Sequence, residues 1–334
     1  MVKKAMAIIE NLLGEDDAFL AVLEQTSQLA QLNKPILIVG ERGTGKELIA
    51  KRLHYLSPRW QAPFVSLNCA ALSSQLVDSE LFGHEAGSFT GAAKRHAGRF
   101  ERANQGSLFL DELATTPMET QQKLLRVIEY GEYERVGGSQ TLLADVRLIC
   151  ATNGDLPELA KTGEFRADLL DRLAFDVINL PPLRTRGDDI LLLANHFAIE
   201  MSKELNYVFF PGFSQQAQQQ LMDYPWPGNI RELKNVVERS VYRHGESDHL
   251  LDSIVINPFA AQELSPLQRV KDQAESSPLP AFPFSLKGWL AQAEQRAVEL
   301  ALEKSQYNQR QAANLLGLTY HQLRGILKRI QQKN

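Results

Sequence analysis

The sequence predicts an α/β fold in which a parallel sheet carries helices on both faces, followed by an all-α region and a small C-terminal helical domain. Apolar, strand-like runs alternate with helical patterns through the first half of the chain. From Asp188 onward the apolar residues recur only at helical spacing. A stretch rich in proline and serine, 257–283, then precedes a basic C-terminal segment, so we expect a linker there.

The first buried strand is expected at 35–39, because this run is apolar and rich in β-branched residues. It leads into a loop with Gly40, Gly43 and Gly45, where the lack of Cβ atoms lets consecutive N–H groups turn towards a phosphate. Lys46 adds a positive charge. The helical pattern after it places a helix N-terminus at the same anion.

This loop matches the phosphate-binding pattern G-x-x-x-x-G-K-[ST] except that Glu47 replaces the hydroxyl that usually holds Mg²⁺. A tight glycine-rich turn with a chance lysine is the structural alternative. Because strand, loop and helix follow in the order that the motif requires, we predict a nucleoside triphosphate site. Its loop residues are Gly40, Glu41, Arg42, Gly43, Thr44, Gly45, Lys46 and Glu47.

Three further expected strands end in polar side chains. The strands and their polar residues are 63–69 with Asn68, 106–112 with Asp111 and Glu112, and 146–153 with Thr152 and Asn153. Ligands bind beyond the carboxyl ends of parallel strands, so these side chains are expected near the nucleotide. In phosphate-loop proteins the first acid holds Mg²⁺ and the second orients or deprotonates the attacking water. The alternatives are a satisfied strand-end asparagine and a solvated acidic turn.

Gly87 and Gly91 flank a short expected loop, with Phe89 and Thr90 at its tip. A large aromatic side chain presented between glycines on a loop is a candidate partner contact. A lone exposed phenylalanine normally carries no such meaning, so composition alone leaves both interpretations open.

Arg166 and Arg172 lie almost two helical turns apart and alternate with Asp168 and Asp171. One interpretation is a surface helix with local ion pairs. The other is an arginine that reaches the γ-phosphate of a nucleotide, where it contributes far more. The position of these side chains relative to the nucleotide decides between the two.

Helical patterns cover 190–205, 214–222 and 229–243, which predicts an all-α subdomain. The run Pro225-Trp226-Pro227-Gly228 forces a break before the last helix, and that helix carries Arg231.

The segment from Ser285 to the end has eight basic and three acidic side chains, a net charge of +5, whereas the whole chain carries −4. Such a basic terminus on an acidic body indicates that the terminus meets nucleic acid. An apolar seam with alternating steps of four and three either self-associates or joins the domain's own core. The seam is Leu286, Leu290, Ala293, Ala297 and Leu300.

Thr319 and Gln322 form a capping box after Gly317, so a second short helix begins there and the pair forms a helix-turn-helix. The start of that helix would face base edges, and the basic residues after it would meet phosphates. The DNA-binding set is Thr319, Tyr320, His321, Gln322, Arg324, Lys328 and Arg329. The expected core is Ala312, Ala313, Leu316, Leu318, Leu323 and Ile326. A plain helical hairpin with a solvated basic face is the alternative.

The sequence shows no signal peptide, and no apolar run approaches the length of a bilayer span. Cys69 and Cys150 each lie in an apolar stretch, which favours buried thiols and a reducing compartment. We therefore expect a cytoplasmic protein without membrane insertion.

Taken together, the motifs resemble the bacterial enhancer-binding activators of sigma-54 RNA polymerase, which belong to the AAA+ ATPases. The segment 40–47 is similar to the family's phosphate loop, including its terminal glutamate, and 106–112 to its second nucleotide motif. The segment 87–92 resembles the family's G-A-F-T-G-A loop, which touches sigma-54, with Ser88 in place of alanine. The implied contact residues are Gly87, Ser88, Phe89, Thr90, Gly91 and Ala92.

The resemblance also implies roles for the strand-end residues. Asp111 would bind Mg²⁺, Glu112 would act on the attacking water, and Asn68 would hold Glu112 until hydrolysis. Thr152 and Asn153 would form the first nucleotide sensor.

Arg231 would be the second sensor, in a helical lid. Arg166 and Arg172 would be fingers offered to the neighbouring subunit's nucleotide. Such fingers require a ring, and the family forms hexamers.

The implied activity is the coupling of ATP hydrolysis to remodelling of the sigma-54 closed promoter complex into an open one, with the protein bound at enhancer DNA. The implied domains are 1–183 for the α/β nucleotide-binding subdomain, 184–255 for the lid, 256–284 for the linker, and 285–334 for a Fis-like helix-turn-helix domain. A remodelling AAA+ chaperone or replication initiator has no reason to carry the loop at Phe89. A DNA-binding repressor that uses ATP only to set its oligomeric state would lack Glu112, Thr90 or the arginines.

No receiver or ligand-sensing domain is expected before Asn11, so control would come from another protein, from abundance or from nucleotide. In this respect the chain resembles family members that activate phage-shock genes, which implies a repressing partner of the phage-shock protein A type. Trp60, in a polar segment, is a hypothetical docking point for that partner.

Overall fold

The computed structural model describes residues 12–259, 285–305 and 308–331. It divides into two compact units, Met1–Phe259 and Ala260–Asn334. Most of the expected linker, 256–284, lies outside the described residues. Within the described part of the chain, no helix is both long and apolar enough to cross a membrane.

The first unit contains the expected parallel sheet, with five strands in the order β2-β3-β6-β1-β7. The strands are β1 (Ile36–Val39), β2 (Phe64–Asn68), β3 (Ser107–Asp111), β6 (Arg147–Thr152) and β7 (Val177–Asn179). Four of them match the strands predicted from apolar runs. The sequence reasoning missed β7, because its three residues are too few to form a recognisable apolar run.

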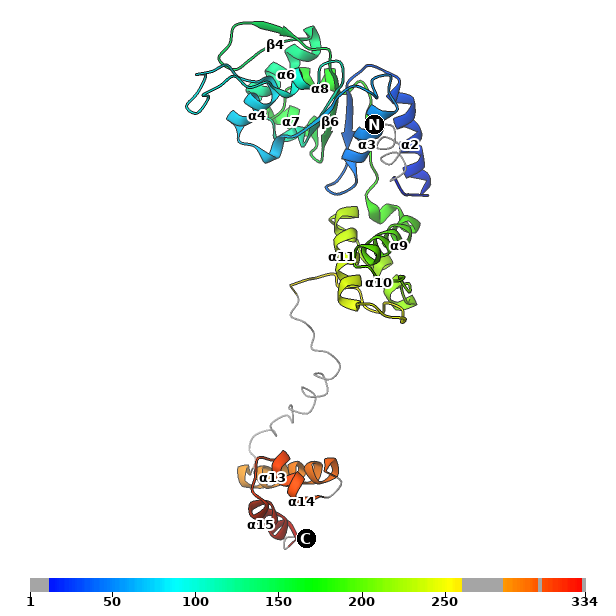
Figure 1. Cartoon of the computed structure of the whole chain (residues 1–334), viewed down its shortest axis with the longest axis vertical. Helices are drawn as coiled ribbons and strands as arrows, with labels where there is room; N and C mark the ends of the chain where they lie inside the picture. Colours follow the sequence, from blue (N-terminus) through cyan, green and yellow to red (C-terminus); the bar gives the residue numbers. More distant parts are fainter. Residues whose placement is uncertain (1–11, 260–284, 306–307, 332–334) are drawn as a thin grey trace. The chain divides into compact units, whose positions relative to one another are not determined.

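Helices cover both faces of this sheet, as the fold class requires (Figure 1). Among the described residues, this part contains the helices α2 (Asp17–Ala30), α3 (Lys46–Tyr55), α4 (Ser74–Phe82), α5 (Arg99–Arg102), α6 (Met118–Tyr130), α7 (Leu156–Thr162) and α8 (Ala167–Leu173). Successive side chains of β1 alternate between two cores. Ile36 and Ile38 pack with α2 and α3, whereas Leu37 packs with the helices of the other face.

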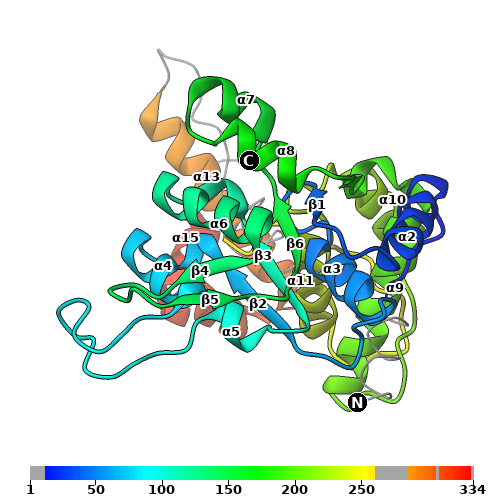
Figure 2. The ribbon, with the colours of Figure 1, turned by 90° about the horizontal axis from the view of Figure 1, so that it is seen from above.

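Short elements connect these layers. Three 3₁₀ turns follow β2, β3 and β7: η1 (Cys69–Ala71), η2 (Leu113–Thr115) and η3 (Leu183–Thr185). An antiparallel hairpin of β4 (Glu132–Glu134) and β5 (Thr141–Leu143) follows α6. The segment between α4 and α5, cyan in Figures 1 and 2, extends away from the sheet and its helices.

The helical part of the first unit consists of α9 (Gly187–Glu204), α10 (Gln215–Asp223) and α11 (Asn229–His244). These helices correspond to the three predicted from periodicity, and they enclose their own apolar core. Trp226, in the proline-rich break before α11, is fully buried in that core and donates its indole N–H to the carbonyl of Leu221 at 2.8 Å.

The second unit contains α13 (Leu286–Lys304), α14 (Gln309–Leu315) and α15 (Tyr320–Gln331). The capping box is confirmed, because Thr319 N–H donates to Gln322 Oε1 at 2.8 Å and Gln322 N–H donates to Thr319 Oγ1 at 3.4 Å. The expected core residues are buried or half-buried together with Val298 and Ala301. All five residues of the α13 seam are exposed, so the seam does not belong to the described core, and self-association is the remaining interpretation.

A buried ion pair ties the N-terminal segment to the helical part. The Arg186 and Asp189 side chains are only 1% and 0% exposed, with Nη2 and Oδ2 2.8 Å apart. Asp189 Oδ1 also accepts the N–H groups of Glu15 and Asp16, at 2.6 and 3.2 Å. The Arg186 guanidinium lies 3.7 Å from the centroid of the Phe19 ring. Both charged groups therefore have partners within the protein.

We predict that Asp189→Ala lowers the free energy of unfolding by about 3–5 kcal/mol, because it leaves the buried Arg186 guanidinium without its carboxylate. Urea unfolding followed by circular dichroism measures the change. Asp188→Ala, at an exposed position of the same helical turn, is the matched control and should change stability by no more than about 0.5 kcal/mol. Equal losses in both variants would contradict the role given to the buried pair.

Candidate nucleotide site and contact surfaces

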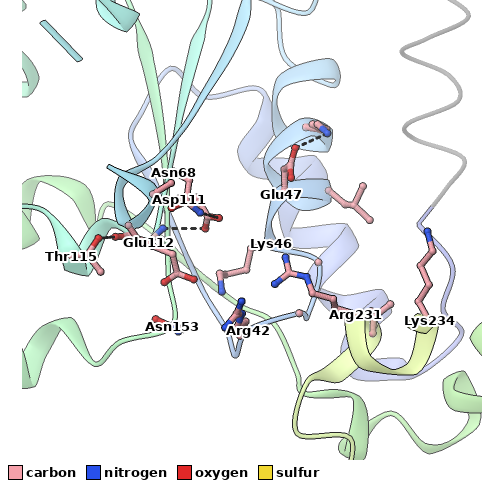
Figure 3. A pocket seen from close by; sticks show the side chains of 17 residues that line it. Arg42, Lys46, Glu47, Asn68, Asp111, Glu112, Thr115, Asn153, Arg231 and Lys234 are labelled. Atoms are coloured by element: carbon pink, nitrogen blue, oxygen red, sulfur yellow. Dashed lines mark hydrogen bonds and ion pairs between the residues drawn. The ribbon is translucent and has the colours of Figure 1, made fainter. Parts of the chain in front are cut away.

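A cavity of about 740 Å³ opens at the carboxyl edge of the sheet, between the phosphate loop, the ends of β2, β3 and β6, and the start of α11 (Figure 3). Ten of the predicted nucleotide residues line it: Arg42, Gly43, Gly45, Lys46, Glu47, Asn68, Asp111, Glu112, Asn153 and Arg231. The predicted residues Gly40, Glu41, Thr44 and Thr152 are not among its lining. Thr152 is buried, and its hydroxyl accepts the N–H of Gly154 at 2.9 Å.

The phosphate loop has the backbone geometry that its glycines permit. Gly43 and Gly45 have φ of 84° and 98°, in the region that favours glycine, and α3 begins immediately afterwards at Lys46. Lys46 is 7% exposed, and its ammonium donates to the carbonyl oxygens of Gly40 at 2.9 Å and Glu41 at 3.3 Å.

The charges around Lys46 come from both sides of the cavity. Figure 3 shows its side chain between the acids of β3 and Arg231 of α11. Burial lowers the pKa of the Lys46 ammonium, Glu112 and Asp111 raise it, and Arg231 lowers it further. The cavity lining combines five cationic side chains with three carboxylates, which suits a polyphosphate accompanied by a metal ion; these are Arg42, Lys46, Lys51, Arg231 and Lys234, and Glu47, Asp111 and Glu112.

The acid pair lies at the end of β3, and its orientation follows from the strand pairing. Asn68 is directly opposite Asp111 in the register of β2 and β3. The Asn68 amide donates to Asp111 Oδ2 at 3.1 Å, and Glu112 N–H donates to Asp111 Oδ1 at 3.0 Å. Glu112 has φ of 54°, a left-handed conformation. The Asn68 amide thus contacts Asp111, because the register places those two side chains together, and its contact with Glu112 stays a prediction.

The two arginines of the predicted finger segment do not line the cavity of their own chain. Arg166, just before α8, makes two hydrogen bonds to Asp168, of 3.0 and 2.6 Å. Arg172 Nε donates to Glu129 Oε1 at 3.0 Å. The local ion pair is therefore present for Arg166, whereas Arg172 pairs with Glu129 of α6, and a contact with nucleotide would have to be made in another subunit.

A smaller apolar cavity of about 90 Å³ adjoins the first one, since Gly45, Leu48 and Ile230 line both. Its other walls come from the N-terminal segment and from α9, including Leu12 and Leu193. Sequence reasoning missed this cavity. Its walls come from segments far apart in the chain, and the only signal was a pair of leucines before α2.

The loop 87–92 is a closed turn within the segment between α4 and α5. Gly87 N–H donates to the carbonyl of Ala92 at 2.8 Å, and Ala92 N–H donates to the carbonyl of Phe89 at 3.0 Å. Gly87 and Gly91 have φ of 82° and 110°, which explains the need for glycine. The Phe89 side chain is 41% exposed, as the partner-contact interpretation requires.

The exposed ring of Phe89 packs against His84, which in turn contacts Ser79. The His84 and Phe89 ring centroids are 4.9 Å apart in an edge-to-face arrangement. His84 Nδ1 lies 2.7 Å from the hydroxyl of Ser79 in α4. The helix that follows Asn68 thus contacts the loop through these two side chains.

Ser88 packs against the turn of the β4–β5 hairpin. A Cβ atom at Gly137 would lie only 2.5 Å from Ser88 Cβ, so the two backbones approach closely. Ser88 Oγ is buried, with no hydrogen-bond partner among the described residues.

In the second unit, most of the predicted DNA-binding residues lie at the surface of α15. Thr319, His321, Gln322, Arg324 and Lys328 are exposed, and Tyr320 is half-buried. The side chain of Arg329 lies outside the described residues.

Three family models match the chain. They are the "Sigma-54 interaction domain" over residues 12–179, the "AAA+ ATPase lid domain" over 184–268, and the "Bacterial regulatory protein, Fis family" over 290–329. The first two cover the α/β and helical parts of the first unit, and the third covers most of the second unit.

Curated relatives agree with these matches. The chain is 63% identical to the Psp operon transcriptional activator of Escherichia coli K12 over 322 residues, which are 96% of this chain and 98% of that protein. It is 42% identical to the regulatory protein AtoC of the same organism over 92% of this chain and 65% of that protein. The Nif-specific regulatory protein of Klebsiella pneumoniae is 42% identical over 94% of this chain and 58% of that protein.

Among solved structures, NtrX from Brucella abortus in complex with ATP has a TM-score of 0.68 and 30% identity, covering 95% of this chain and 68% of that one. The same protein in complex with ADP gives the same TM-score and identity. The predicted fold class is thereby confirmed.

We predict that His84→Ala loosens the loop, because an aromatic pair of this kind contributes about 0.5–1.5 kcal/mol. Hydrogen exchange at the amides of Gly87 and Ala92 should then become about 2- to 12-fold faster. Leu143→Ala, on the exposed strand β5, is the control and should leave both amides unchanged. Unaltered exchange in His84→Ala would show that the ring does not hold the loop.

Proposed function

Because the chain belongs to the sigma-54-dependent activators with an AAA+ lid and a Fis-type helix-turn-helix, we propose that it hydrolyses ATP with Mg²⁺ to convert closed sigma-54 promoter complexes into open ones. The observation that carries this proposal is the 740 Å³ cavity, in which the phosphate loop, the acid pair and Arg231 converge. The ATP-bound and ADP-bound neighbours support a nucleotide as its occupant.

In this proposal, the N–H groups of the phosphate loop and the Lys46 ammonium bind the phosphates, and Arg231 contacts them from the lid. Asp111 fits Mg²⁺, because this ion commonly takes one or two carboxylates together with substrate phosphates and waters. Bound there, Mg²⁺ would offset negative charge on the phosphates. Glu112 would orient the attacking water, and Asn153 would sense the terminal phosphate. The apolar cavity next to Leu48 and Ile230 suits a nucleobase.

The route from nucleotide to polymerase runs along one continuous stretch of chain. Asn68 ends β2 beside Asp111, and η1 and α4 then lead to the loop with Phe89 and Thr90. We propose that a change in the contacts of Asn68 and the acids during hydrolysis shifts α4, and that Ser79 and His84 transmit the shift to the loop. Sigma-54 would be the partner of the exposed Phe89.

We further propose that the subunits assemble into a hexameric ring. Arg166 and Arg172 lie away from the cavity of their own chain and near the surface, which supports a role at the nucleotide of a neighbouring subunit. There they would exchange Asp168 and Glu129 for phosphate oxygens, and their charge would stabilise the transition state.

The second unit would hold the ring near a promoter by binding enhancer DNA through α15. The effect is one of local concentration and needs no new contact with the polymerase. The regulated genes are proposed to be phage-shock genes, on the strength of the similarity to the Psp operon activator. The proposed negative regulator is of the phage-shock protein A type.

The decisive measurement is open-complex formation on a sigma-54 promoter by the purified protein. We expect promoter melting with ATP and none with a non-hydrolysable analogue. Thr90→Ala should hydrolyse ATP but fail to open the promoter, because Thr90 lies outside the nucleotide cavity.

If ATP is hydrolysed and no promoter opens, even at protein concentrations that bypass the enhancer, the client is a different protein. Absence of ATP turnover in the wild-type chain would refute the ATPase assignment itself.

A substitution of Trp60 can test whether a separate regulatory protein represses this activator by docking at that residue. Trp60 lies half-exposed on a turn in which its N–H donates to the carbonyl of Ser57 at 3.2 Å. We expect Trp60→Ala to open promoters as the wild type does but to escape repression by a phage-shock protein A type regulator. A Trp60→Ala protein that stays fully repressible would rule out this docking point.

A further inference from the structure

Residues other than Arg231 also join the phosphate loop to the lid. Their contacts centre on Asn229, the first residue of α11, whose side chain is 0% exposed. Asn229 has φ of 52°, a left-handed conformation that asparagine tolerates better than most residues. Its own N–H donates to the carbonyl of Trp226 at 2.8 Å.

The side-chain amide of Asn229 makes hydrogen bonds both to the phosphate loop and to the start of the helical part. Its Nδ2 group donates to Glu41 Oε2 at 3.1 Å and to the carbonyl of Arg42 at 3.0 Å, both in the phosphate loop. Its Oδ1 accepts the N–H of Leu183 at 2.8 Å, at the start of the helical part. Only an asparagine-type side chain offers two donors and an acceptor over so short a reach.

Two neighbouring contacts hold the same junction. Glu41 makes two hydrogen bonds to Arg184, of 2.6 and 2.8 Å. These hydrogen bonds, and then the one from Asn229, lower the pKa of the Glu41 carboxyl to about 2. The two side chains are 45% and 42% exposed, so the ion pair by itself contributes little to stability.

Backbone packing explains why the junction is narrow. A Cβ atom on Gly43 would lie 2.2 Å from the carbonyl oxygen of Gly228, so the loop can lie against the lid only with glycine there. Because Gly228 directly precedes Asn229, the backbone contact and the amide contacts fix the same point. A displacement of the start of α11 would therefore also move Gly43 and Arg42.

We propose that Asn229 is a positioning residue that sets the phosphate loop in register with the lid, so that Lys46 and Arg231 bind the same polyphosphate. The inference rests on the proposed nucleotide site and assigns to it a residue that need not touch the ligand. Asn229 holds the N-terminal turn of α11, from which Arg231 enters the cavity two residues later.

The test substitution is Asn229→Asp in the full-length chain, with binding of a fluorescent ATP analogue at equilibrium as the readout. Aspartate keeps the size, the tolerance of a left-handed backbone and the acceptor for Leu183. It removes both donations and places a carboxylate beside Glu41. We expect the Kd for the analogue to rise at least 10-fold at a temperature where the variant is still folded, although the buried carboxylate lowers its thermal unfolding midpoint.

The matched control is Asn206→Asp, the same change at an exposed residue with φ of 60° that lies just beyond the C-terminal end of the lid helix α9. It should bind the analogue as the wild type does. In Asn229→Asp, the additional change Glu41→Gln supplies an amide that can donate to the new carboxylate. We expect the double variant to recover most of the affinity of Glu41→Gln alone.

An unchanged Kd in Asn229→Asp would overturn the inference. So would a weaker Kd accompanied by a matching loss of thermal stability and no recovery with Glu41→Gln, since that pattern indicates a merely structural role. If Asn229→Asp does not fold, Asn229→Gly replaces it as the test. Glycine adopts the left-handed backbone conformation at this position but lacks the side-chain amide, so we expect the same rise in Kd. A wild-type chain that binds no analogue would instead refute the proposed nucleotide site.

Discussion

The nucleotide site depends on the parallel register of the central sheet. This register aligns Asn68 with Asp111 and Val39 with Thr152, and it places the start of the phosphate loop at the same edge as the acid pair. A slip of one residue would turn each strand's side chains to the opposite face and separate the polar ends from the loop. The buried apolar residues of β1 and β3 prevent such a slip, because both faces of the sheet are packed. The same core that stabilises the fold therefore fixes the geometry of the cavity.

Buried arginines hold the layers around this sheet in place. Arg147, 2% exposed, donates to the carbonyl oxygens of Leu29, Ala30 and Leu53, near the C-terminal ends of α2 and α3. Burial lowers the pKa of Arg147 to about 10, so the side chain remains charged at neutral pH and complements the negative ends of both helices. A buried arginine thus anchors the two helices that cover one face. Arg186 has the corresponding role between the N-terminal segment and the lid, where Asp189 supplies the opposite charge.

The sequence was most informative where a pattern is local. Long apolar runs ending in polar residues predicted four strands, and the spacing of Thr319 and Gln322 predicted a cap that is present. The contact of Asn68 with Asp111 was not foreseen, because it follows from strand register, which a single sequence does not specify. The apolar cavity near Leu48 was missed because distant segments form it. Asn229 was overlooked for a related reason, since its partners in the phosphate loop lie almost two hundred positions earlier in the chain and only the proline break beside it was visible.

The position of Lys46 bears on which anions the loop selects. Its ammonium already donates to the carbonyl oxygens of Gly40 and Glu41, which leaves one of its three N–H groups for an incoming anion. A small, singly charged anion can engage little more than that one group. A polyphosphate can meet Lys46, Arg231 and the loop amides at once. The loop is therefore better suited to a polyphosphate than to a small anion.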